Sequence, residues 1–369
     1  MNKQILLTLL LVSGSVLPGC VHSPDPSRES VAIAASTHTM DSGKSVADGK
    51  LGKAQVVAAQ PNTARLQERL NNLDLSSAQG NVGIGVLDLD TGERWFRNGK
   101  QRFPMQSVFK LPVGIVVLKL VDEGKLSLNQ TVTITREQFA PAWSPILKEI
   151  KGDRGQFTVQ YLLQRAVGDS DNTAADALVR LVGGPEQVTA NLGRMNLRDI
   201  RVDRLEQQLQ PDTVGLTNFR PELVDKQKYE EAVGQIPDVV KKAAMERYLT
   251  DPRDTATPEG MIDLLVKLQS RQLLSEDSTA LLLKIMTDSP TGQKRLKAGL
   301  PPGWSLAHKT GTGEDVVGIG IATNDVGLIS SPTGKHIAIA VFIAGSKAPL
   351  EQRESVMSAV ASAVIQAMQ

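Results

Sequence analysis

The sequence predicts an α/β fold of the α+β sandwich type, with one antiparallel sheet built from both ends of the folded chain. Three observations lead to this prediction. An alternating apolar pattern with a turn lies at 81–99, β-rich segments return only after residue 304, and the patterns between them are mostly helical. We therefore expect a sheet flanked by terminal helices and an all-helical subdomain.

The folded body is expected to begin with a helix and a hairpin. Leucines recur at helical spacing in 63–73, and the stretch 81–99 alternates across the turn residues Asp-Thr-Gly. Helical spacing then dominates to about residue 283. Strands follow at 305–313, 316–329 and 336–345, and a helix closes the chain at about 350–368. We assign 63–103 and 291–369 to the α/β part and 104–290 to the helical part.

Composition excludes several classes of function. The chain has 369 residues, of which 41% are hydrophobic and 22% charged, enough for one large domain or two smaller ones. Lys and Arg total 41 against 40 for Asp and Glu, so the net charge of +1 gives no electrostatic case for nucleic acid. Four histidines and one cysteine, without grouped spacing, predict no zinc site, and we expect no metal and no cofactor.

The first 20 residues have the features of a secretory leader. Lys3 precedes an apolar run over 5–12 that is too short to span a membrane, and the stretch ends in Leu-Pro-Gly-Cys. This ending resembles a bacterial lipobox, in which Cys20 is lipidated; the alternative is ordinary signal peptidase cleavage near Ala35 or Cys20. Both predict export to the periplasm. Residues 21–62 have the composition of a disordered tether, which leaves 63–369 as the folded body.

Ser107 and Lys110 form a Ser-x-x-Lys pair within Met-Gln-Ser-Val-Phe-Lys. Positions i and i+3 share one side of a helix, so the lysine can act as a base for the serine hydroxyl. A lysine does so only where burial or nearby positive charge lowers its pKa. Taken alone the spacing is weak evidence, because it is also that of an ordinary amphipathic helix start.

Two further polar groups accompany this pair. Ser170, Asp171 and Asn172 interrupt an apolar helical segment, where the alternative interpretation is a helix N-cap. Lys309, Thr310, Gly311 and Thr312 lie on an expected strand, where the alternative is an edge strand with a solubilising lysine. Gly311 lacks a side chain, which would let a ligand lie against the strand backbone.

Together, the Ser-x-x-Lys, Ser-Asp-Asn and Lys-Thr-Gly motifs resemble those of the penicillin-recognising serine enzymes, and more closely the class A serine β-lactamases. The likeness covers residue 63 to the C-terminus, so it implies that 63–369 is the catalytic domain and that the active site lies between the sheet part and the helical subdomain. Four further segments resemble parts of that family: 204–209, similar to the start of its Ω loop; 251–258, similar to its end; 141–145, a rim segment with Trp143; and 291–304, before the Lys-Thr-Gly strand.

The resemblance implies that the protein hydrolyses the β-lactam amide of penicillins and cephalosporins and gives antibiotic resistance. Ser107 would form the acyl-enzyme, with Lys110 as base or proton relay. Glu206 would act through a bound water in acylation, deacylation or both. Ser170 would pass a proton to the lactam nitrogen, and Lys309 would help to hold that proton path.

The resemblance also implies how the substrate is held. The backbone N–H groups of Ser107 and Thr312 would form the oxyanion hole. The implied substrate-binding residues are Asn172, Trp143, Thr310, Gly311, Thr312 and Arg295. Expected partners are limited to a small-molecule β-lactam and, through the N-terminal lipid, the membrane; we expect a monomer.

Two side chains depart from the family pattern. Many members carry an arginine on the strand after Lys-Thr-Gly, whereas here Arg295, before that strand, would supply the charge; the alternative is a solvated residue between Lys294 and Lys297. Gln210 stands where the family usually has Asn, which helps to fix the hydrolytic water. The extra methylene of Gln210 is expected to alter how that water is held.

The Ω loop departs in length. Arg204 should pair with Asp254 to fix the loop, yet these residues are 50 positions apart. We predict an insertion of about 35 residues at about 214–250, and loops of that length usually carry structure or function. The stretch 237–249 is expected to form a helix that either caps the active site or packs on the surface.

Two other functions use the same motifs. A penicillin-binding transpeptidase or carboxypeptidase would stay acylated by β-lactams, and a non-hydrolytic sensor would hold the acyl-enzyme and signal. Glu206, 34 positions after Asn172, favours the hydrolase because deacylation needs a base in that loop. The motifs leave the substrate spectrum open.

Overall fold

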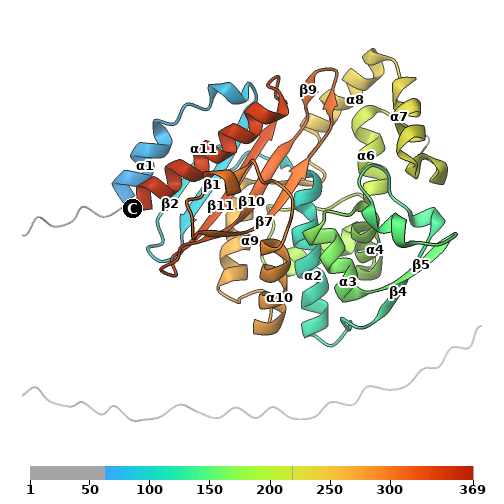
Figure 1. The fold of residues 1–369 in the computed structure, drawn as a ribbon, viewed down its shortest axis with the longest axis horizontal. Coiled ribbons are helices and arrows are strands. Elements are labelled where there is room, and N and C mark those ends of the chain that lie inside the picture. Colours follow the sequence, from blue (N-terminus) through green and yellow to red (C-terminus); the bar gives the residue numbers. More distant parts are fainter. Residues whose placement is uncertain (1–62, 218, 369) are drawn as a thin grey trace, which may run out of the picture. The chain divides into compact units, whose positions relative to one another are not determined.

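The computed structural model describes residues 63–217 and 219–368, which belong to one compact unit (Figure 1). The expected leader, Cys20 and the tether lie outside the described residues. A five-stranded sheet has the order β2-β1-β11-β10-β7, with antiparallel pairing throughout. Its strands are β1 (Asn81–Asp88), β2 (Arg94–Arg97), β7 (Ser305–Thr312), β10 (Thr323–Ser330) and β11 (His336–Ala344). The expected sheet from both chain ends is confirmed.

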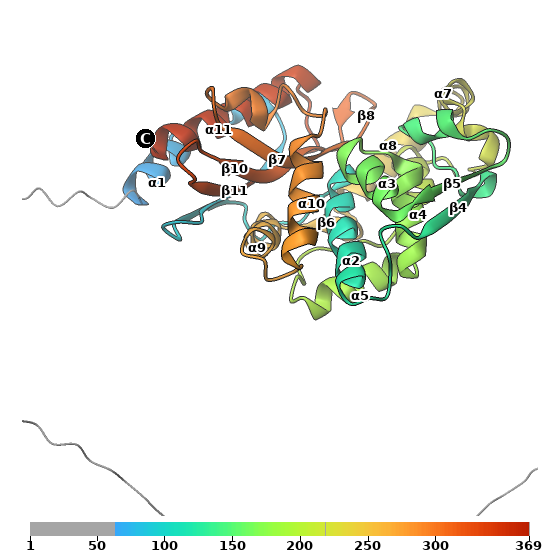
Figure 2. The same cartoon turned by 60° about the horizontal axis from the view of Figure 1, so that its bottom comes forward.

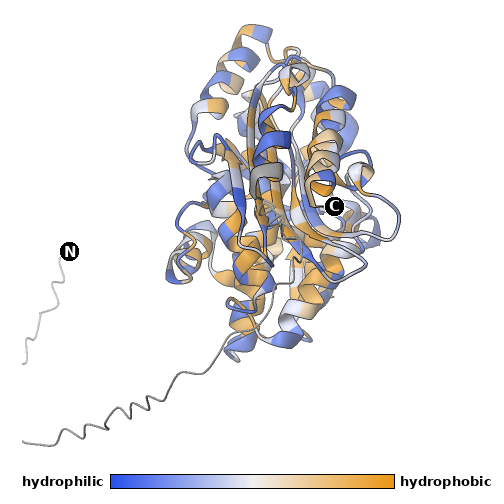
Figure 3. Ribbon diagram, turned by 90° about the vertical axis from the view of Figure 1, so that its left-hand side faces the viewer, coloured by the Kyte–Doolittle hydropathy of each residue, from blue (hydrophilic) through white to orange (hydrophobic). Residues whose placement is uncertain are grey.

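The sheet buries both of its faces. On β11, Ile337, Ile339 and Val341 belong to an apolar cluster with the helices α1 (Thr63–Asn71) and α11 (Leu350–Met368). Alternate residues such as Phe342 belong instead to the core shared with the helical part. This period of two follows from the pleat of a strand. Figure 3 shows hydrophobic positions concentrated along the sheet and hydrophilic ones on the outer helices.

Helix α2 (Lys110–Asp122) forms the centre of the helical part (Figure 2). Its residues 110–118 are all buried, which is typical of a helix that is apolar all round. Around it lie α3 (Val159–Leu163), a π-helical turn (Gln164–Gly168), α4 (Asn172–Val182), α5 (Pro185–Arg194), α9 (Pro258–Gln269) and α10 (Glu276–Thr287). Helix α9 also packs on β1 and β11, so the helical part covers the second face of the sheet.

The expectation of an all-helical subdomain is wrong. Strands β4 (Thr131–Thr135) and β5 (Arg154–Thr158) form an antiparallel ribbon, and β3 (Phe103–Pro104) pairs with β6 (Thr255–Ala256). The sequence Thr-Val-Thr-Ile-Thr is β-branched throughout and buries Ile134, which favours a strand. A third ribbon, β8 (Asp315–Val316) with β9 (Ile319–Gly320), follows the Lys-Thr-Gly strand.

The expected insertion carries helices. After α6 (Glu206–Val214) come a 3-10 turn (Pro221–Val224), α7 (Lys226–Gly234) and α8 (Asp238–Thr250), and α8 packs against α6. Figure 1 shows these helices in yellow beside the end of the sheet that carries β8 and β9. Within the part of the chain that the structure describes, no helix is both long and apolar enough to cross a membrane.

Candidate active site

Ser107 lies in a 3-10 turn (Gln106–Phe109) that leads directly into α2. Lys110 is the first residue of that helix, and its Nζ donates a 2.9 Å hydrogen bond to Ser107 Oγ. The residue before the serine, Gln106, has φ of +45°, a conformation rare for residues with a side chain. Such strain is held only where surrounding contacts fix the backbone, and it is common at functional sites.

The Lys110 ammonium is fully buried and its three N–H bonds are all used. Besides Ser107, they donate to the Ser170 carbonyl oxygen at 2.7 Å and to Asn172 Oδ1 at 2.6 Å. Glu206 Oε1 lies 2.9 Å from Nζ as an ion pair between fully buried side chains. This oxygen accepts no hydrogen bond from any described residue, so a lone pair remains on it for a water O–H.

A second buried lysine faces Ser170 from the edge strand β7. Lys309 Nζ donates to Ser170 Oγ at 2.9 Å and to the Thr310 carbonyl oxygen at 2.8 Å. Burial lowers the pKa of Lys309 well below its ordinary value, and the nearby Lys110 ammonium lowers it further. Ser170 is therefore held by both lysines, by Lys309 at its hydroxyl and by Lys110 at its carbonyl oxygen.

The three residues of the Ser-Asp-Asn triplet have different roles: one caps a helix, and the other two contact the buried lysines. Asp171 is the N-cap of α4, accepting from Ala174 N at 2.9 Å and from Ile146 N at 2.6 Å, so the capping interpretation is right for this residue. Burial raises the pKa of Asp171 to about 6. Ser170 and Asn172 face the lysines instead, and Asn172 Nδ2 donates to the Pro141 carbonyl oxygen at 2.8 Å.

The reason for a glycine at 311 differs from the one we expected. A Cβ on Gly311 would lie 2.3 Å from the Met105 carbonyl oxygen and 3.1 Å from Val108 N. The space beside the strand is therefore filled by the backbone of the nucleophile turn and not left for a ligand. Asn324, which sequence reasoning missed, holds the same turn by donating to the carbonyl oxygens of Pro104 and Met105, both at 2.9 Å.

Arg295 is held against β7. Its guanidinium donates to Thr312 Oγ1 at 2.7 Å and to the Asn324 carbonyl oxygen at 2.9 Å, and it pairs with Glu354 of α11 at 3.1 Å. Only 4% of the surface of Arg295 is exposed, so the alternative interpretation, a solvated surface charge, is wrong. Thr310 Oγ1 lies nearby on the strand and donates to Thr291 Oγ1.

Trp143 is the most exposed aromatic candidate, with 61% of its surface accessible. Its Nε1 donates to the Asp169 carbonyl oxygen at 2.8 Å, and its own carbonyl accepts from Asn172 N at 2.8 Å. The indole therefore lies next to the Ser-Asp-Asn turn with most of its surface open to solvent.

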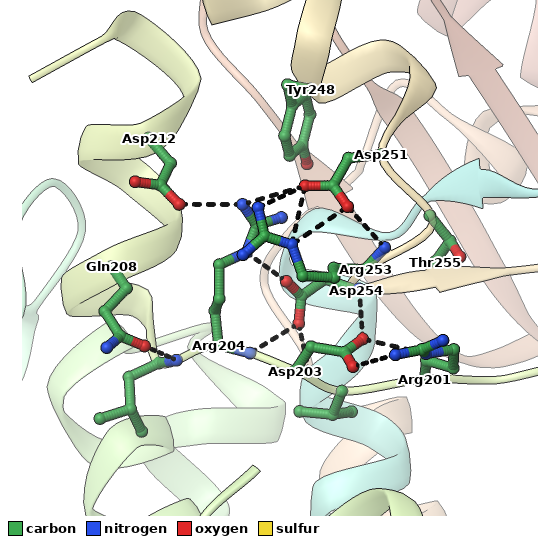
Figure 4. A network of polar contacts seen from close by, with 12 residues as sticks. Arg201, Asp203, Arg204, Gln208, Asp212, Tyr248, Asp251, Arg253, Asp254 and Thr255 are labelled. Atoms are coloured by element: carbon green, nitrogen blue, oxygen red, sulfur yellow. Dashed lines mark hydrogen bonds and ion pairs between the residues drawn. The ribbon is translucent and has the colours of Figure 1, made fainter. Parts of the chain in front are cut away.

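Arg204 and Asp254 form the expected ion pair, at 2.6 Å, and they lie in a wider network (Figure 4). The Arg204 guanidinium also lies 3.0 Å from Asp212 of α6 and 3.6 Å from Asp251 at the end of α8. Asp212 and Asp251 were missed because no local pattern distinguishes them. One buried arginine thus joins both ends of the insertion.

Asp176 is another residue that sequence reasoning missed. It lies on α4 one turn after Asn172, and its carboxylate accepts from Glu206 N at 2.7 Å and Gln207 N at 3.1 Å. Burial, followed by the negative charge of Glu206, raises the pKa of Asp176 to about 7, against those two hydrogen bonds. The spacing of four from Asn172 was the signal available in the sequence.

Gln210 contacts Glu206 directly. Its Nε2 donates to Glu206 Oε2 at 2.7 Å and to Gln106 Oε1 at 3.2 Å. The longer side chain therefore orients the carboxylate itself.

A model of the β-lactamase enzyme family matches residues 65–368. The chain belongs to this family. It is 34% identical to the extended-spectrum β-lactamase PER-1 of Pseudomonas aeruginosa, over 82% of this chain and 86% of that protein. It is also 32% identical to β-lactamase VEB-1 of the same organism, over 83% of this chain and 91% of that protein.

Solved structures agree with this assignment. A β-lactamase from Chitinophaga pinensis superposes with a TM-score of 0.67 at 29% identity, covering 84% of this chain and 100% of that one. An ancestral class A β-lactamase gives a TM-score of 0.66 at 32% identity, covering 82% of this chain and 99% of that one. The protein is a class A β-lactamase, as the three motifs predicted, and its active site lies between the sheet edge and the helical part.

Proposed function

We propose that this β-lactamase hydrolyses penicillins and cephalosporins through an acyl-enzyme on Ser107 and so protects its host cell from these drugs. The observation that carries the proposal is the buried cluster in which Lys110 Nζ lies 2.9 Å from both Ser107 Oγ and Glu206 Oε1. A serine needs such a neighbouring base to become a nucleophile. Because PER-1 is an extended-spectrum enzyme, we include extended-spectrum cephalosporins among the substrates.

Acylation begins when Ser107 Oγ forms a bond to the lactam carbonyl carbon. The carbonyl electron pair moves onto its oxygen, which accepts hydrogen bonds from the backbone N–H groups of Ser107 and Thr312. The hydroxyl proton leaves through a water to Glu206, or to Lys110 after the Lys110 ammonium has passed a proton to Glu206 Oε1, 2.9 Å away. The C–N bond then breaks, and Ser170 Oγ gives its proton to the nitrogen while it takes a replacement proton from Lys309 Nζ, 2.9 Å away. Before deacylation Glu206 loses the proton that came from Ser107 and Lys309 regains one, so the two transfers cancel.

Deacylation uses Glu206 as the general base. Its Oε1 takes a proton from water, whose oxygen attacks the ester carbon, and the bond to Ser107 Oγ breaks as that oxygen regains a proton. The hydrogen bond from Gln210 to Oε2 orients the carboxylate for this step. Family members usually have Asn here, so Gln210 supports the base by direct contact.

Recognition of the substrate falls to the strand edge and the rim. Thr310, Thr312 and the Arg295 guanidinium bind the substrate carboxylate, since charge-assisted hydrogen bonds to an anion are strong. Asn172 binds the side-chain amide of the drug, and Trp143 packs its exposed ring against the acyl substituent.

Turnover measured together with intact mass tests this function. The protein from about Gln60 onward is mixed with a chromogenic cephalosporin and with benzylpenicillin. We expect sustained hydrolysis with little acyl-enzyme, and neither hydrolysis nor a mass increase with Ser107→Ala. A persistent mass increase on Ser107 without turnover would instead identify a penicillin-binding protein or sensor.

The proposal extends to the cellular location. We propose export to the periplasm, anchoring through a lipid on Cys20, and a monomeric state. In cells that express the full chain, activity should be found in the membrane fraction and move to the soluble periplasm with Cys20→Ser. Soluble activity from the unaltered chain would favour ordinary signal peptidase cleavage. Light scattering of the purified protein tests the monomer.

A further inference from the structure

We propose that Tyr248, on the inserted helix α8, is a positioning residue for the base Glu206 and acts through Gln106 and Gln210. The inference rests on the proposed deacylation by Glu206. It gives the insertion a part in turnover that is neither of the two expected ones, a cap over the site or passive packing on the surface.

A chain of hydrogen bonds connects the four side chains. Gln106 Nε2 donates to Tyr248 Oη at 2.6 Å, Gln210 Nε2 donates to Gln106 Oε1 at 3.2 Å, and the same Nε2 donates to Glu206 Oε2 at 2.7 Å. Every member is buried, with 0–9% of its surface exposed. Water therefore has little access to replace any of these bonds.

The charge of Glu206 fixes the direction of the whole chain. A carboxylate only accepts hydrogen bonds, so Gln210 must turn its NH₂ group toward Glu206. That NH₂ group also faces Gln106, which must present its carbonyl oxygen. The NH₂ group of Gln106 then points to the far side, where Tyr248 Oη is the acceptor.

Tyr248 is itself firmly placed. Its ring lies beneath the Arg204 guanidinium, 5.8 Å from centroid to Cζ, and Arg204 is held by Asp212, Asp251 and Asp254. The ionic network of Figure 4 therefore holds the tyrosine that ends the hydrogen-bonded chain. Gln106, in its strained conformation next to Ser107, lies between the insertion and the base.

Loss of the acceptor should loosen the base. Tyr248→Phe leaves a buried N–H of Gln106 without a partner, a condition that a buried amide avoids by turning or by recruiting water. Either response weakens the bond from Gln106 to Gln210 and so frees the Glu206 carboxylate. We expect kcat to fall about tenfold. KM should fall with it, and acyl-enzyme should accumulate at steady state.

The matched control is Tyr229→Phe. Tyr229 is the other tyrosine of the insertion, on α7; it is 5% exposed and its hydroxyl bonds to none of the residues that the structure describes. We expect the kcat and the acyl-enzyme level of Tyr229→Phe to match those of the unaltered enzyme. A purely structural contribution of the inserted helices would affect both variants alike.

A double-mutant cycle separates this chain from general destabilisation. Gln106→Met, which removes the intermediate amide, should slow deacylation by itself, and Tyr248→Phe should then have no further effect. Additive effects in the cycle, a Tyr248→Phe enzyme that behaves like Tyr229→Phe, or a loss of kcat/KM as large as that of kcat without acyl-enzyme would overturn the inference. Absence of turnover by the unaltered enzyme would refute the proposed function instead.

Discussion

Two walls of the active site are held by different forces. The sheet wall consists of β7, with Lys309 and Thr312, and Arg295 laid against it. Strand β7 pairs with β10 along its whole length, from Ser305 to Thr312, so main-chain hydrogen bonds set its position. The Ω wall consists of α6, which begins at Glu206. Side-chain contacts hold it in position, chiefly the ion pairs of Arg204.

This difference separates binding from turnover. A main-chain ladder holds β7 in place when one side chain is lost, so changes on the sheet wall should act mainly through the contacts that the side chain makes, which for Arg295 include Glu354 as well as the substrate. The Ω wall depends on a few buried charges, and removing one leaves its partners unpaired. Changes there should alter stability and deacylation together. Four variants test this contrast, from the largest expected effect to the smallest.

Glu206→Gln should have the largest effect. The variant keeps the size of the side chain but cannot take a proton from water, and loss of a general base typically costs about 10²- to 10⁴-fold in rate. Rapid-quench mass spectrometry should show acyl-enzyme that forms and persists. Normal turnover by this variant would mean that the Ω-loop assignment is wrong.

Asp254→Ala should destabilise the Ω wall. It leaves Arg204, 5% exposed, without its closest carboxylate, and breaking a buried pair costs about 3–5 kcal/mol. Urea unfolding measures the loss. The control is Arg253→Ala, which removes the partly exposed pair with Asp251, and exposed pairs contribute at most about 1 kcal/mol. Equal losses from the two variants would contradict the contrast.

Arg295→Ala tests the sheet wall. Loss of a charged hydrogen bond to the substrate carboxylate costs about 1.5–3 kcal/mol, or about 10- to 100-fold in kcat/KM, mainly through KM. Its exposed neighbour is the control, since Lys294→Ala should leave both constants unchanged. An unchanged KM for Arg295→Ala would assign recognition of the carboxylate to Thr310 and Thr312 alone.

Asp176→Asn should change the pH dependence of stability. The raised pKa of Asp176, about 7, means that the folded protein holds a proton which the unfolded chain releases near pH 4. This contribution to the free energy of unfolding is complete below pH 4 and is lost as the pH rises to about 7. Asn cannot titrate, so urea midpoints of the variant should decline less steeply over that range. Because the pKa of Asp171 is also raised, the urea midpoints of both proteins should still decline somewhat as the pH rises.

The sequence predicted the sheet, the order of its strands along the chain and the motif residues, because these depend on short-range patterns. The alternation in β11 and the Ser-x-x-Lys spacing are visible within ten residues. The prediction of an all-helical subdomain failed at β4 and β5, because a polar β-branched stretch lies there inside a region dominated by helical spacing. The reason predicted for Gly311 was also wrong, since the backbone of Met105 that approaches this glycine is distant in sequence.

By itself the sequence determined the family and the pairing of Arg204 with Asp254 across a long insertion, and it predicted Ser107 as the nucleophile. Only the tertiary structure decided how that insertion is used. Tyr248 and Gln106 are 142 positions apart, and no periodicity links them. Their contact exists because α8 packs on α6 and on β3, which lies directly before the nucleophile turn, and because a polar group buried there must find a protein partner in place of water.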